Sequence, residues 1–334
     1  MKYKFCDHFP ENLENIDIKD IHKLLDGPTL IHIRGRRDDA LYLSTLLHGN
    51  ETTSFLMLQR LIKKYREVEL PRDLIIFIGN TEAAACGMRH LPGQADYNRI
   101  WEEGFTPENE LAMDVINYAK EQNIFASLDI HNNTGKNPHY GCINVLNEQF
   151  IDLASHFGSH TVYFTEPHNV QSMAFSKFCT SITIESGKPG LESGTRASFE
   201  FVDKIFNMDK LEANPARENP EIFHTFARML VDENANIDFE NTPCVKNDLS
   251  FLPDIDENNF EVLTKGTQIG FARDKSFISV KDDFGKDLTD DFLKFEEGKI
   301  LLNRTFIPSM FTKDVFVMKE DCLGYIMELM IPTT

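Results

Sequence analysis

The chain has 334 residues, of which 53 are acidic and 34 are basic, and its formal net charge is −19 at pH 7. This charge would repel a nucleic-acid backbone or an anionic membrane surface, so we exclude both as expected partners. The length is typical of two domains, and an apolar fraction of 41% is enough to build hydrophobic cores.

The N-terminal stretch MKYKFCDHFPENLENIDIKD carries acidic residues where a signal peptide would be apolar. No segment approaches the roughly 18 consecutive apolar residues that would span a membrane. The six cysteines form no CxxC pair or other close spacing, so they indicate reduced thiols and no disulfide framework. We therefore expect a cytoplasmic protein, and a homo-oligomer is compatible with the sequence.

Short apolar runs rich in β-branched residues alternate with helical patterns in the first 210 residues or so. Such runs are typical of strands that are covered on both faces. The predicted strands are residues 29–33, 40–47, 74–78, 125–130, 140–145, 161–164 and 181–184. Helices are predicted after Thr52 and Thr53, after Thr106 and Pro107, after Asn147, and over 194–208. This alternation predicts a mainly parallel or mixed α/β sheet flanked by helices.

The pattern changes near residue 241, where short alternating segments are separated by Asp, Asn, Gly and Pro. It predicts a smaller β-rich C-terminal domain over residues 241–334. The stretch PEIFHTFARMLVDEN just before it has a helical pattern and is predicted to close the first domain, residues 1–240.

Polar side chains follow three of the predicted strands. His48 and Glu51 follow the second strand, His131 follows ASLDI, and Glu185 follows SITI. Ligand sites of open α/β sheets lie at the carboxyl ends of the strands. Two histidines and a glutamate are a common ligand set for catalytic zinc, and Glu185 would be the proton acceptor.

Each of these residues has an ordinary alternative when it is taken alone. A histidine and a glutamate three residues apart occur by chance in many chains, and a histidine at a strand end often makes only local hydrogen bonds. Gly49, between His48 and Glu51, would let the backbone turn tightly. His139 lies close to the His131 loop and is an alternative ligand.

The stretch GMRHLPGQADYNRIW, residues 87–101, contains two arginines, an aspartate, an asparagine and the only tryptophan of the chain. Guanidinium groups suit carboxylate binding and the stabilisation of negative charge. Asp96 could orient a metal-binding imidazole by accepting a hydrogen bond from the ring nitrogen that does not bind the metal. Taken alone, the stretch also suits an ordinary solvated loop.

The motifs HGNE, DYNRIW, LDIHNNTG and ITIESG, with Arg89 after the first, occur in an order that resembles the zinc carboxypeptidase superfamily. The details are most similar to its succinylglutamate desuccinylase and aspartoacylase branch. The resemblance covers roughly residues 41–187, and the β-rich C-terminal segment fits the smaller domain of that branch. It implies one zinc ion bound by His48, Glu51 and His131.

The resemblance also implies roles for other residues. Glu185 matches the glutamate that accepts a proton from the attacking water, and Arg89 matches the arginine that polarises the scissile carbonyl. Asn98 and Arg99 match the pair that binds a substrate carboxylate. Asp96 matches a residue hydrogen-bonded behind a histidine ligand.

The sequence departs from the branch at three points. The gap between Arg89 and Asn98 is longer, through HLPGQA, and the loop HNNTGKNPHYG diverges after its first residues. The tyrosine that often completes such sites has no clear match, and Tyr163 and Tyr325 are the candidates. For this reason the substrate itself does not carry over from the resemblance.

The sequence therefore predicts a zinc-dependent amide hydrolase that acts on a small carboxylate-bearing substrate. Deacylation of an N-acyl amino acid is the favoured reaction, because the C-terminal domain of this branch narrows the entrance to the site. A metallocarboxypeptidase acting on peptides is one alternative. A non-catalytic protein that binds an acidic metabolite is a second one.

Overall fold

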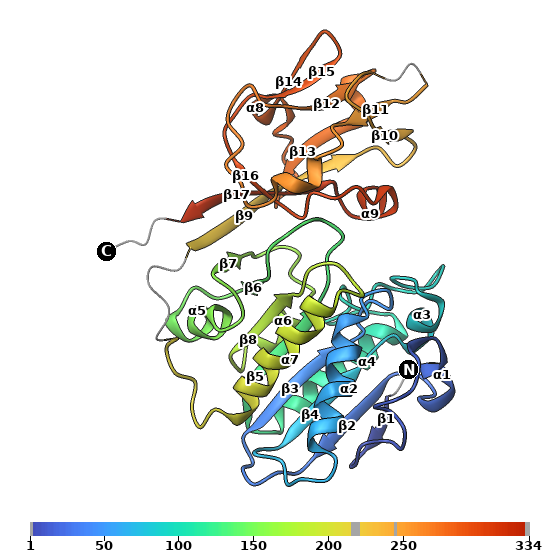
Figure 1. Cartoon of the computed structure of the whole chain (residues 1–334), viewed down its shortest axis with the longest axis vertical. Coiled ribbons are helices and arrows are strands. Elements are labelled where there is room, and N and C mark those ends of the chain that lie inside the picture. The colour runs from blue at the N-terminus through green and yellow to red at the C-terminus, as the bar shows by residue number, and fades with distance from the viewer. Residues whose placement is uncertain (1–2, 215–220, 244–245, 331–334) are drawn as a thin grey trace. The chain divides into compact units, whose positions relative to one another are not determined.

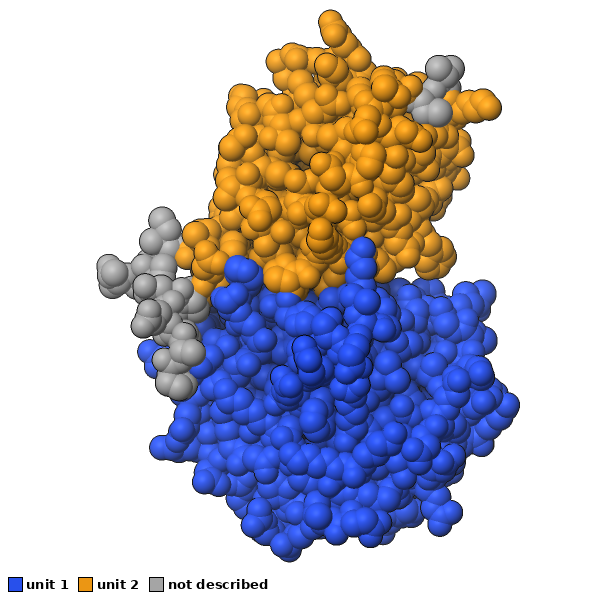
Figure 2. Space-filling view, in the orientation of Figure 1, with its two compact units in different colours: residues 1–132, 139–220 blue, residues 133–138, 221–334 orange. Residues whose placement is uncertain are grey.

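The computed structural model describes residues 3–214, 221–243 and 246–330 (Figure 1). The chain forms two compact units, which are coloured separately in Figure 2. Unit 1 comprises residues 1–132 and 139–220, and unit 2 comprises residues 133–138 and 221–334. The units thus divide at 220/221, earlier in the chain than the 240/241 boundary expected from the sequence.

The prediction of a helix over PEIFHTFARMLVDEN is wrong. Residues Glu221–Val231 form strand β9, which belongs to unit 2. Its side chains alternate between buried and more exposed positions, and it pairs antiparallel with two strands that lie 40 or more residues further along the chain. Hydrogen bonding to these distant strands outweighs the local helical pattern.

Unit 1 contains a mixed sheet in the strand order β1-β2-β4-β3-β5-β8-β6-β7. Its strands are β1 (Lys4–Cys6), β2 (Thr29–Ile33), β3 (Ala40–Thr45), β4 (Leu74–Ile78), β5 (Ile124–His131), β6 (Tyr140–Ile143), β7 (His160–Tyr163) and β8 (Ser181–Glu185). The central strands β4, β3, β5 and β8 run parallel to one another. Strands β2 and β6 run antiparallel to β4 and β8. This arrangement confirms the predicted fold class, and every strand predicted before residue 185 is present.

Helices cover both faces of this sheet. They are α1 (Ile21–Leu24), α2 (Thr53–Tyr65), α3 (Thr81–Cys86), α4 (Pro107–Lys120), α5 (Glu148–Ser155), α6 (Gln171–Phe175) and α7 (Glu192–Asn207). The predicted start of α4 is confirmed, because the Thr106 hydroxyl accepts a hydrogen bond from the Asn109 amide at 3.2 Å and Pro107 is the first helical residue. Asn147 caps α5 in the same way, at 3.1 Å from the Phe150 amide.

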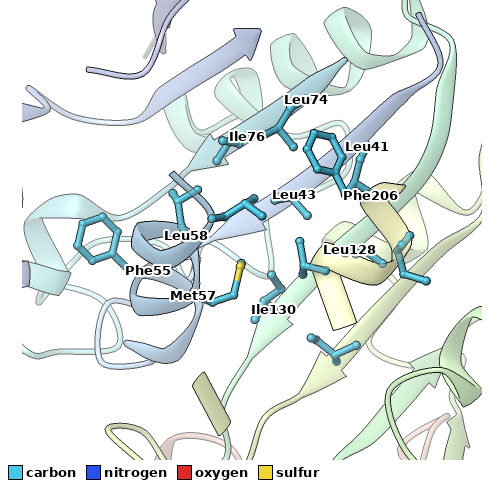
Figure 3. Packing of buried hydrophobic residues seen from close by; sticks show 14 of the residues in the cluster. Leu41, Leu43, Phe55, Met57, Leu58, Leu74, Ile76, Leu128, Ile130 and Phe206 are labelled. Carbon is cyan, nitrogen blue, oxygen red and sulfur yellow. The ribbon is translucent and has the colours of Figure 1, made fainter. Parts of the chain in front are cut away.

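The two faces of the sheet have separate hydrophobic cores. Leu41 and Leu43 of β3 lie in the core beneath α2 and α7, which Figure 3 shows from close by. Tyr42, between them, lies in the other core with Trp101 and with residues of α4 and α6. Because side chains alternate along a strand, the odd-numbered residues of β5 and β8 face the α6 side. Asp129, His131 and Glu185 therefore share one face.

Phe206 of α7 has no exposed surface, and its ring makes an edge-to-face contact with Tyr65 at 5.2 Å. Phe206→Ala is expected to lower the free energy of unfolding by about 3–5 kcal/mol, because it leaves a cavity between α7 and the sheet. Urea unfolding followed by circular dichroism measures this loss. Phe105→Ala removes a fully exposed ring and should cost less than about 0.5 kcal/mol. Equal losses for the two variants would contradict the assignment of Phe206 to the core.

Unit 2 is mostly β-structure, as predicted for the C-terminal part of the chain. In it, β9 pairs with β13 (Ile278–Asp282) and with β17 (Gly324–Met330), and β17 pairs with β16 (Ile307–Ser309). A second sheet has the order β10 (Ile237–Phe239), β11 (Leu249–Phe251), β12 (Gln268–Ala272), β15 (Lys299–Leu302) and β14 (Leu293–Glu296). The short helices α8 (Thr289–Phe292) and α9 (Val315–Glu320) complete the unit. One hydrophobic cluster connects both sheets.

Two further observations concern the described residues. None of their helices combines the length and the apolar character needed to cross a membrane. The cysteines at 6, 86, 142, 179 and 322 are free thiols. Cys244 lies outside the described residues.

Candidate metal centre

The candidate site lies where three parallel strands of unit 1 end. His131 is the last residue of β5 and Glu185 is the last residue of β8, and the two are paired in register. His48 and Glu51 lie in the loop between β3 and α2, and β3 is the other neighbour of β5. The carboxyl ends of parallel neighbours meet at one edge of the sheet, so the fold brings together residues that are distant in sequence.

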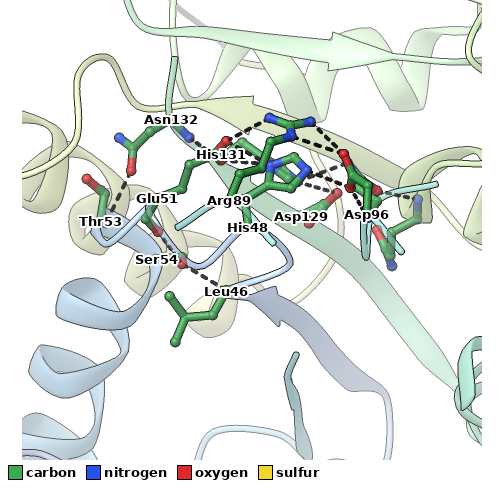
Figure 4. A network of polar contacts seen from close by, with 12 residues as sticks. Leu46, His48, Glu51, Thr53, Ser54, Arg89, Asp96, Asp129, His131 and Asn132 are labelled. Carbon is green, nitrogen blue, oxygen red and sulfur yellow. Dashed lines mark hydrogen bonds and ion pairs between the residues drawn. The ribbon is translucent and has the colours of Figure 1, made fainter. Parts of the chain in front are cut away.

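His48, Glu51 and His131 form a buried triad whose potential ligand atoms lie within 4.8 Å of one another. Glu51 bridges the two rings, with Oε1 2.7 Å from His48 Nδ1 and Oε2 2.8 Å from His131 Nδ1 (Figure 4). The three residues are only 4%, 7% and 4% exposed. The structure therefore brings together all three of the ligands predicted from the sequence.

Neighbouring charged groups strongly shift the pKa values of Glu51 and His131. Burial alone would raise the pKa of Glu51, but the adjacent His48 and His131 outweigh burial and hold this pKa well below its usual value. Burial alone would lower the pKa of His131, but the Asp129 and Glu51 carboxylates raise it well above its usual value. Glu51 thus remains an anionic ligand at neutral pH, whereas His131 must release a proton before it can bind a metal.

A carboxylate lies behind each histidine. Asp96 Oδ1 is 2.9 Å from His48 Nε2, and Asp129 Oδ2 is 2.9 Å from His131 Nε2. Because an ionised carboxylate only accepts hydrogen bonds, these contacts place a proton on each Nε2. Each Nδ1 atom faces the Glu51 carboxylate and, once it carries no proton, can act as a metal ligand, as in the carboxylate–histidine–metal arrangements of metalloproteins.

The donor set fits zinc. Two imidazole nitrogens and one carboxylate oxygen are the three protein ligands of one common type of catalytic zinc site. The neighbouring Asp96 and Asp129 carboxylates add negative charge that favours a cation. In the described part of the chain, no other group of three or more His, Cys, Asp or Glu side chains meets this geometric criterion.

Asp129 is a site residue that the sequence analysis missed. The signal was present, because Asp129 precedes His131 by two residues in one strand and so faces the same side of the sheet. Asn132 was also missed. Its backbone N–H donates to Glu51 Oε2 at 2.9 Å, its Oδ1 accepts from the Thr53 amide at 3.2 Å, and its Nδ2 donates to the Gly187 carbonyl at 2.7 Å. Asn132 thereby ties the start of α2 to the loop that follows Glu185.

Arg89 lies at the triad. Its Nε and one terminal nitrogen lie 3.0 and 2.9 Å from Asp96 Oδ2, and the other terminal nitrogen is 3.6 Å from Glu51 Oε1. Burial alone would raise the pKa of Asp96, but His48 and Arg89 lower it far below its usual value. Arg89 therefore lies at the site, although the sequence between Arg89 and Asn98 is longer than in the family it resembles.

Asn98 and Arg99 are neighbours in the sequence, but they differ in burial and in hydrogen-bond partners. Asn98 is only 7% exposed, and its amide lies against His131 and against the start of α6. Arg99 is half-buried, and one of its terminal nitrogens donates to the Asn98 carbonyl at 2.8 Å.

Three other candidates lie outside the triad. His139 stacks on Phe157 at 5.7 Å and near Gly187, so it is not one of the converging ligands. Tyr163 ends β7 and packs against the core on the α2 and α7 side of the sheet, opposite to the face of His131. Tyr325 lies in β17 of unit 2.

Gly49 is required by close packing, and not by an unusual turn. A Cβ atom at this position would lie 2.2 Å from the Ala84 backbone nitrogen and 2.6 Å from the Met88 carbonyl oxygen. The unusual backbone is at Leu46, whose φ is +53°. The β3–α2 loop that carries His48 is thus pressed against α3.

Gly49→Ala is expected to displace this loop, lowering the free energy of unfolding by about 1–3 kcal/mol and weakening metal binding. Chemical unfolding and zinc titration against a chelator measure the two effects. Gly93→Ala is the matched control. Gly93 has φ +78°, so alanine there strains the backbone and lowers stability. No atom lies within 4 Å of an added Cβ, so zinc affinity should stay unchanged. Normal zinc affinity in Gly49→Ala would contradict this account of the loop.

Residues 37–200 match the family model of the succinylglutamate desuccinylase/aspartoacylase catalytic domain. A succinylglutamate desuccinylase of Pseudomonas aeruginosa is 32% identical over 124 residues, which are 33% of this chain and 37% of that protein. This match therefore spans little more than a third of the relative.

Solved structures resemble a larger part of the chain. A succinylglutamate desuccinylase/aspartoacylase from Rhodobacter sphaeroides covers 90% of this chain, over 88% of its own, with a TM-score of 0.61 and 15% identity. Murine aminoacylase 3 covers 88% of this chain, over 96% of its own, with a TM-score of 0.56 and 17% identity. At such identities the likeness shows a shared fold.

Proposed function

Because the chain belongs to the succinylglutamate desuccinylase/aspartoacylase family, we propose that it is a zinc-dependent hydrolase that deacylates a small N-acyl amino acid. The observation that carries the proposal is the convergence of His48, Glu51 and His131 at the strand ends, with Glu185 in register beside His131. Solved structures of similar fold include proteins named for desuccinylase and aminoacylase activities.

The residues of the site have complementary roles in this proposal. His48, Glu51 and His131 would hold the zinc ion, which would polarise the amide carbonyl and make a water molecule more acidic. The Glu185 carboxylate would take a proton from the attacking water and pass it to the leaving nitrogen. Arg89, which already faces Glu51, would stabilise the negative charge that develops on the carbonyl oxygen.

Arginines would also select an anionic substrate. The chain is strongly acidic as a whole, yet Arg89 and Arg99 lie together in the loop before α4. Guanidinium groups in a partly buried site can concentrate positive potential locally, even in a protein of net negative charge. We assign substrate carboxylate binding to Asn98 and Arg99, the pair expected from the sequence. The free thiols among the described cysteines suit a reducing compartment such as the cytoplasm.

A panel of N-acetyl, N-succinyl and N-aspartyl amino acids, assayed beside peptides of two to eight residues with zinc present, tests the substrate class. We expect release of a free amino acid from one or more N-acyl amino acids and no shortening of the longer peptides. Stepwise removal of C-terminal residues would instead identify a metallocarboxypeptidase. Tight binding of acidic metabolites without any turnover would identify a non-catalytic binding protein, an alternative that the presence of all four of His48, Glu51, His131 and Glu185 disfavours.

A further inference from the structure

Asn132 directly follows the predicted ligand His131, and its hydrogen bonds reach two other segments of unit 1. Its backbone N–H donates to Glu51 Oε2 at 2.9 Å. Its Oδ1 accepts from the backbone N–H of Thr53, the first residue of α2, at 3.2 Å, and its Nδ2 donates to the Gly187 carbonyl oxygen at 2.7 Å. These partners fix the amide orientation, because an N–H requires the oxygen and a carbonyl requires the nitrogen. Asn132 is only 5% exposed, so its amide is directed at the protein backbone.

The bond to Gly187 lies at the point where the pairing of β5 with β8 ends. These parallel strands are paired up to His131 and Glu185, and the Ser186 N–H donates to the His131 carbonyl oxygen at 2.9 Å. Gly187 then turns the chain away with φ +73°, a conformation that glycine adopts without strain. Beyond the paired strands, the Asn132 side chain therefore connects the segment after His131 to the segment after Glu185.

We infer that Asn132 is a positioning residue that holds the Glu185 carboxylate in place relative to the metal ligands. This inference rests on the proposed function and deepens it. The backbone of Asn132 binds the predicted ligand Glu51, and its side chain holds the segment that follows the proton acceptor. One residue thus connects the two parts of the site that act together on the attacking water.

The physical basis is the sensitivity of proton transfer to distance. A general base has to lie within about 2.6–3.2 Å of the atom whose proton it takes, and a misplacement of about 1 Å can cost about 10²-fold in rate. Glu185 is the last residue of β8, and the ends of elements open more easily than their centres. Ser186 Oγ lies 2.8 Å from Ser198 Oγ of α7, which holds this strand end on the α7 side. Asn132 holds it from the segment that contacts Glu51.

Asn132→Leu tests this role, because leucine has nearly the same shape as asparagine but its side chain forms no hydrogen bonds. The variant loses the bonds to Gly187 and Thr53 and keeps the backbone N–H that donates to Glu51. Asn132→Ala removes the same two bonds without placing a methyl group against the Gly187 carbonyl, so it serves as a second variant. Far-UV circular dichroism and thermal unfolding of the metal-free proteins establish that both are folded.

Asn144→Leu is the matched control. Asn144 is 7% exposed, and its Nδ2 donates to the Phe164 carbonyl oxygen at 3.2 Å, so the same chemical change removes a similar buried bond. It follows Ile143, which is paired with Ile182 at the end of β8 away from Glu185. A loss of stability alone is therefore expected from this variant.

Two measurements are made on each protein. In hydrogen–deuterium exchange of the metal-free form, a peptide that includes residues 186–190 should exchange faster in both Asn132 variants than in the unmodified protein or in Asn144→Leu. At saturating zinc, kcat for the best N-acyl amino acid should fall about 10–100-fold in the Asn132 variants, while KM and zinc affinity stay within about threefold. Asn144→Leu should keep a normal kcat, KM and zinc affinity.

Normal exchange of this peptide in the Asn132 variants would overturn the inference, and so would a normal kcat despite faster exchange. A loss of zinc affinity as large as the loss of kcat would also overturn it, because Asn132 would then support the metal ligands and not Glu185. If the unmodified protein bound zinc but hydrolysed no N-acyl amino acid, the proposed function would fail. Hydrogen exchange would still decide whether Asn132 holds the segment after Glu185, so the two failures are distinguishable.

Discussion

Glu185→Gln is expected to reduce kcat for the best N-acyl amino acid by about 10²–10⁴-fold, because an amide of the same shape cannot accept the proton of the attacking water. Zinc binding should remain at one ion per chain, since Glu185 is not part of the triad. Steady-state kinetics and zinc analysis of the same preparation measure the two quantities.

Glu200→Gln is a matched control for this variant. Glu200 is an exposed glutamate of α7, so the same chemical change there should leave both kcat and zinc content unaltered. A Glu185→Gln enzyme that keeps near-normal turnover would remove Glu185 from proton transfer. A zinc-free Glu185→Gln enzyme would instead make Glu185 part of the metal centre.

His131→Ala is expected to have the largest effect on metal binding. It removes one of three protein ligands and leaves the Glu51 and Asp129 carboxylates buried without the imidazole between them. The loss of zinc affinity should exceed the roughly 10–100-fold loss that follows removal of a group behind a ligand. Added zinc should therefore stabilise this variant against heat much less than it stabilises the unmodified protein.

His139→Ala is the control that separates ligand loss from loss of any histidine near the site. His139 is half-buried and stacks on Phe157, so its replacement should lower stability slightly and leave zinc affinity intact. Zinc titration of both variants and thermal unfolding with and without zinc make the comparison. Normal zinc affinity in His131→Ala with a loss in His139→Ala would mean that the ligand set is wrongly assigned.

The central strands and the triad could be predicted because their signals are local. Strands β3, β4 and β8 are buried on both faces, so their sequences are rich in apolar and β-branched residues, and a histidine or glutamate at the end of such a run is conspicuous. The parallel order of these strands then places His48, His131 and Glu185 at one edge without further information. Only the ligand geometry had to come from the structure.

Other features depend on contacts between distant segments. Whether residues 221–231 form a helix or a strand is decided by β13 and β17, which no local pattern in β9 reveals. The orientation of the Asn98 side chain depends on a backbone N–H of α6, 73 residues further along the chain. Gly49 was rightly singled out, but the reason for it is the approach of α3, which the sequence of the loop does not encode.

X-ray diffraction at the zinc absorption edge, from crystals of protein purified without chelators, tests the central claim most directly. We expect one anomalous peak per chain, about 2.0–2.2 Å from His48 Nδ1, His131 Nδ1 and a Glu51 oxygen. A zinc-loaded protein with no peak between these three side chains would contradict the metal centre and the hydrolase function built on it.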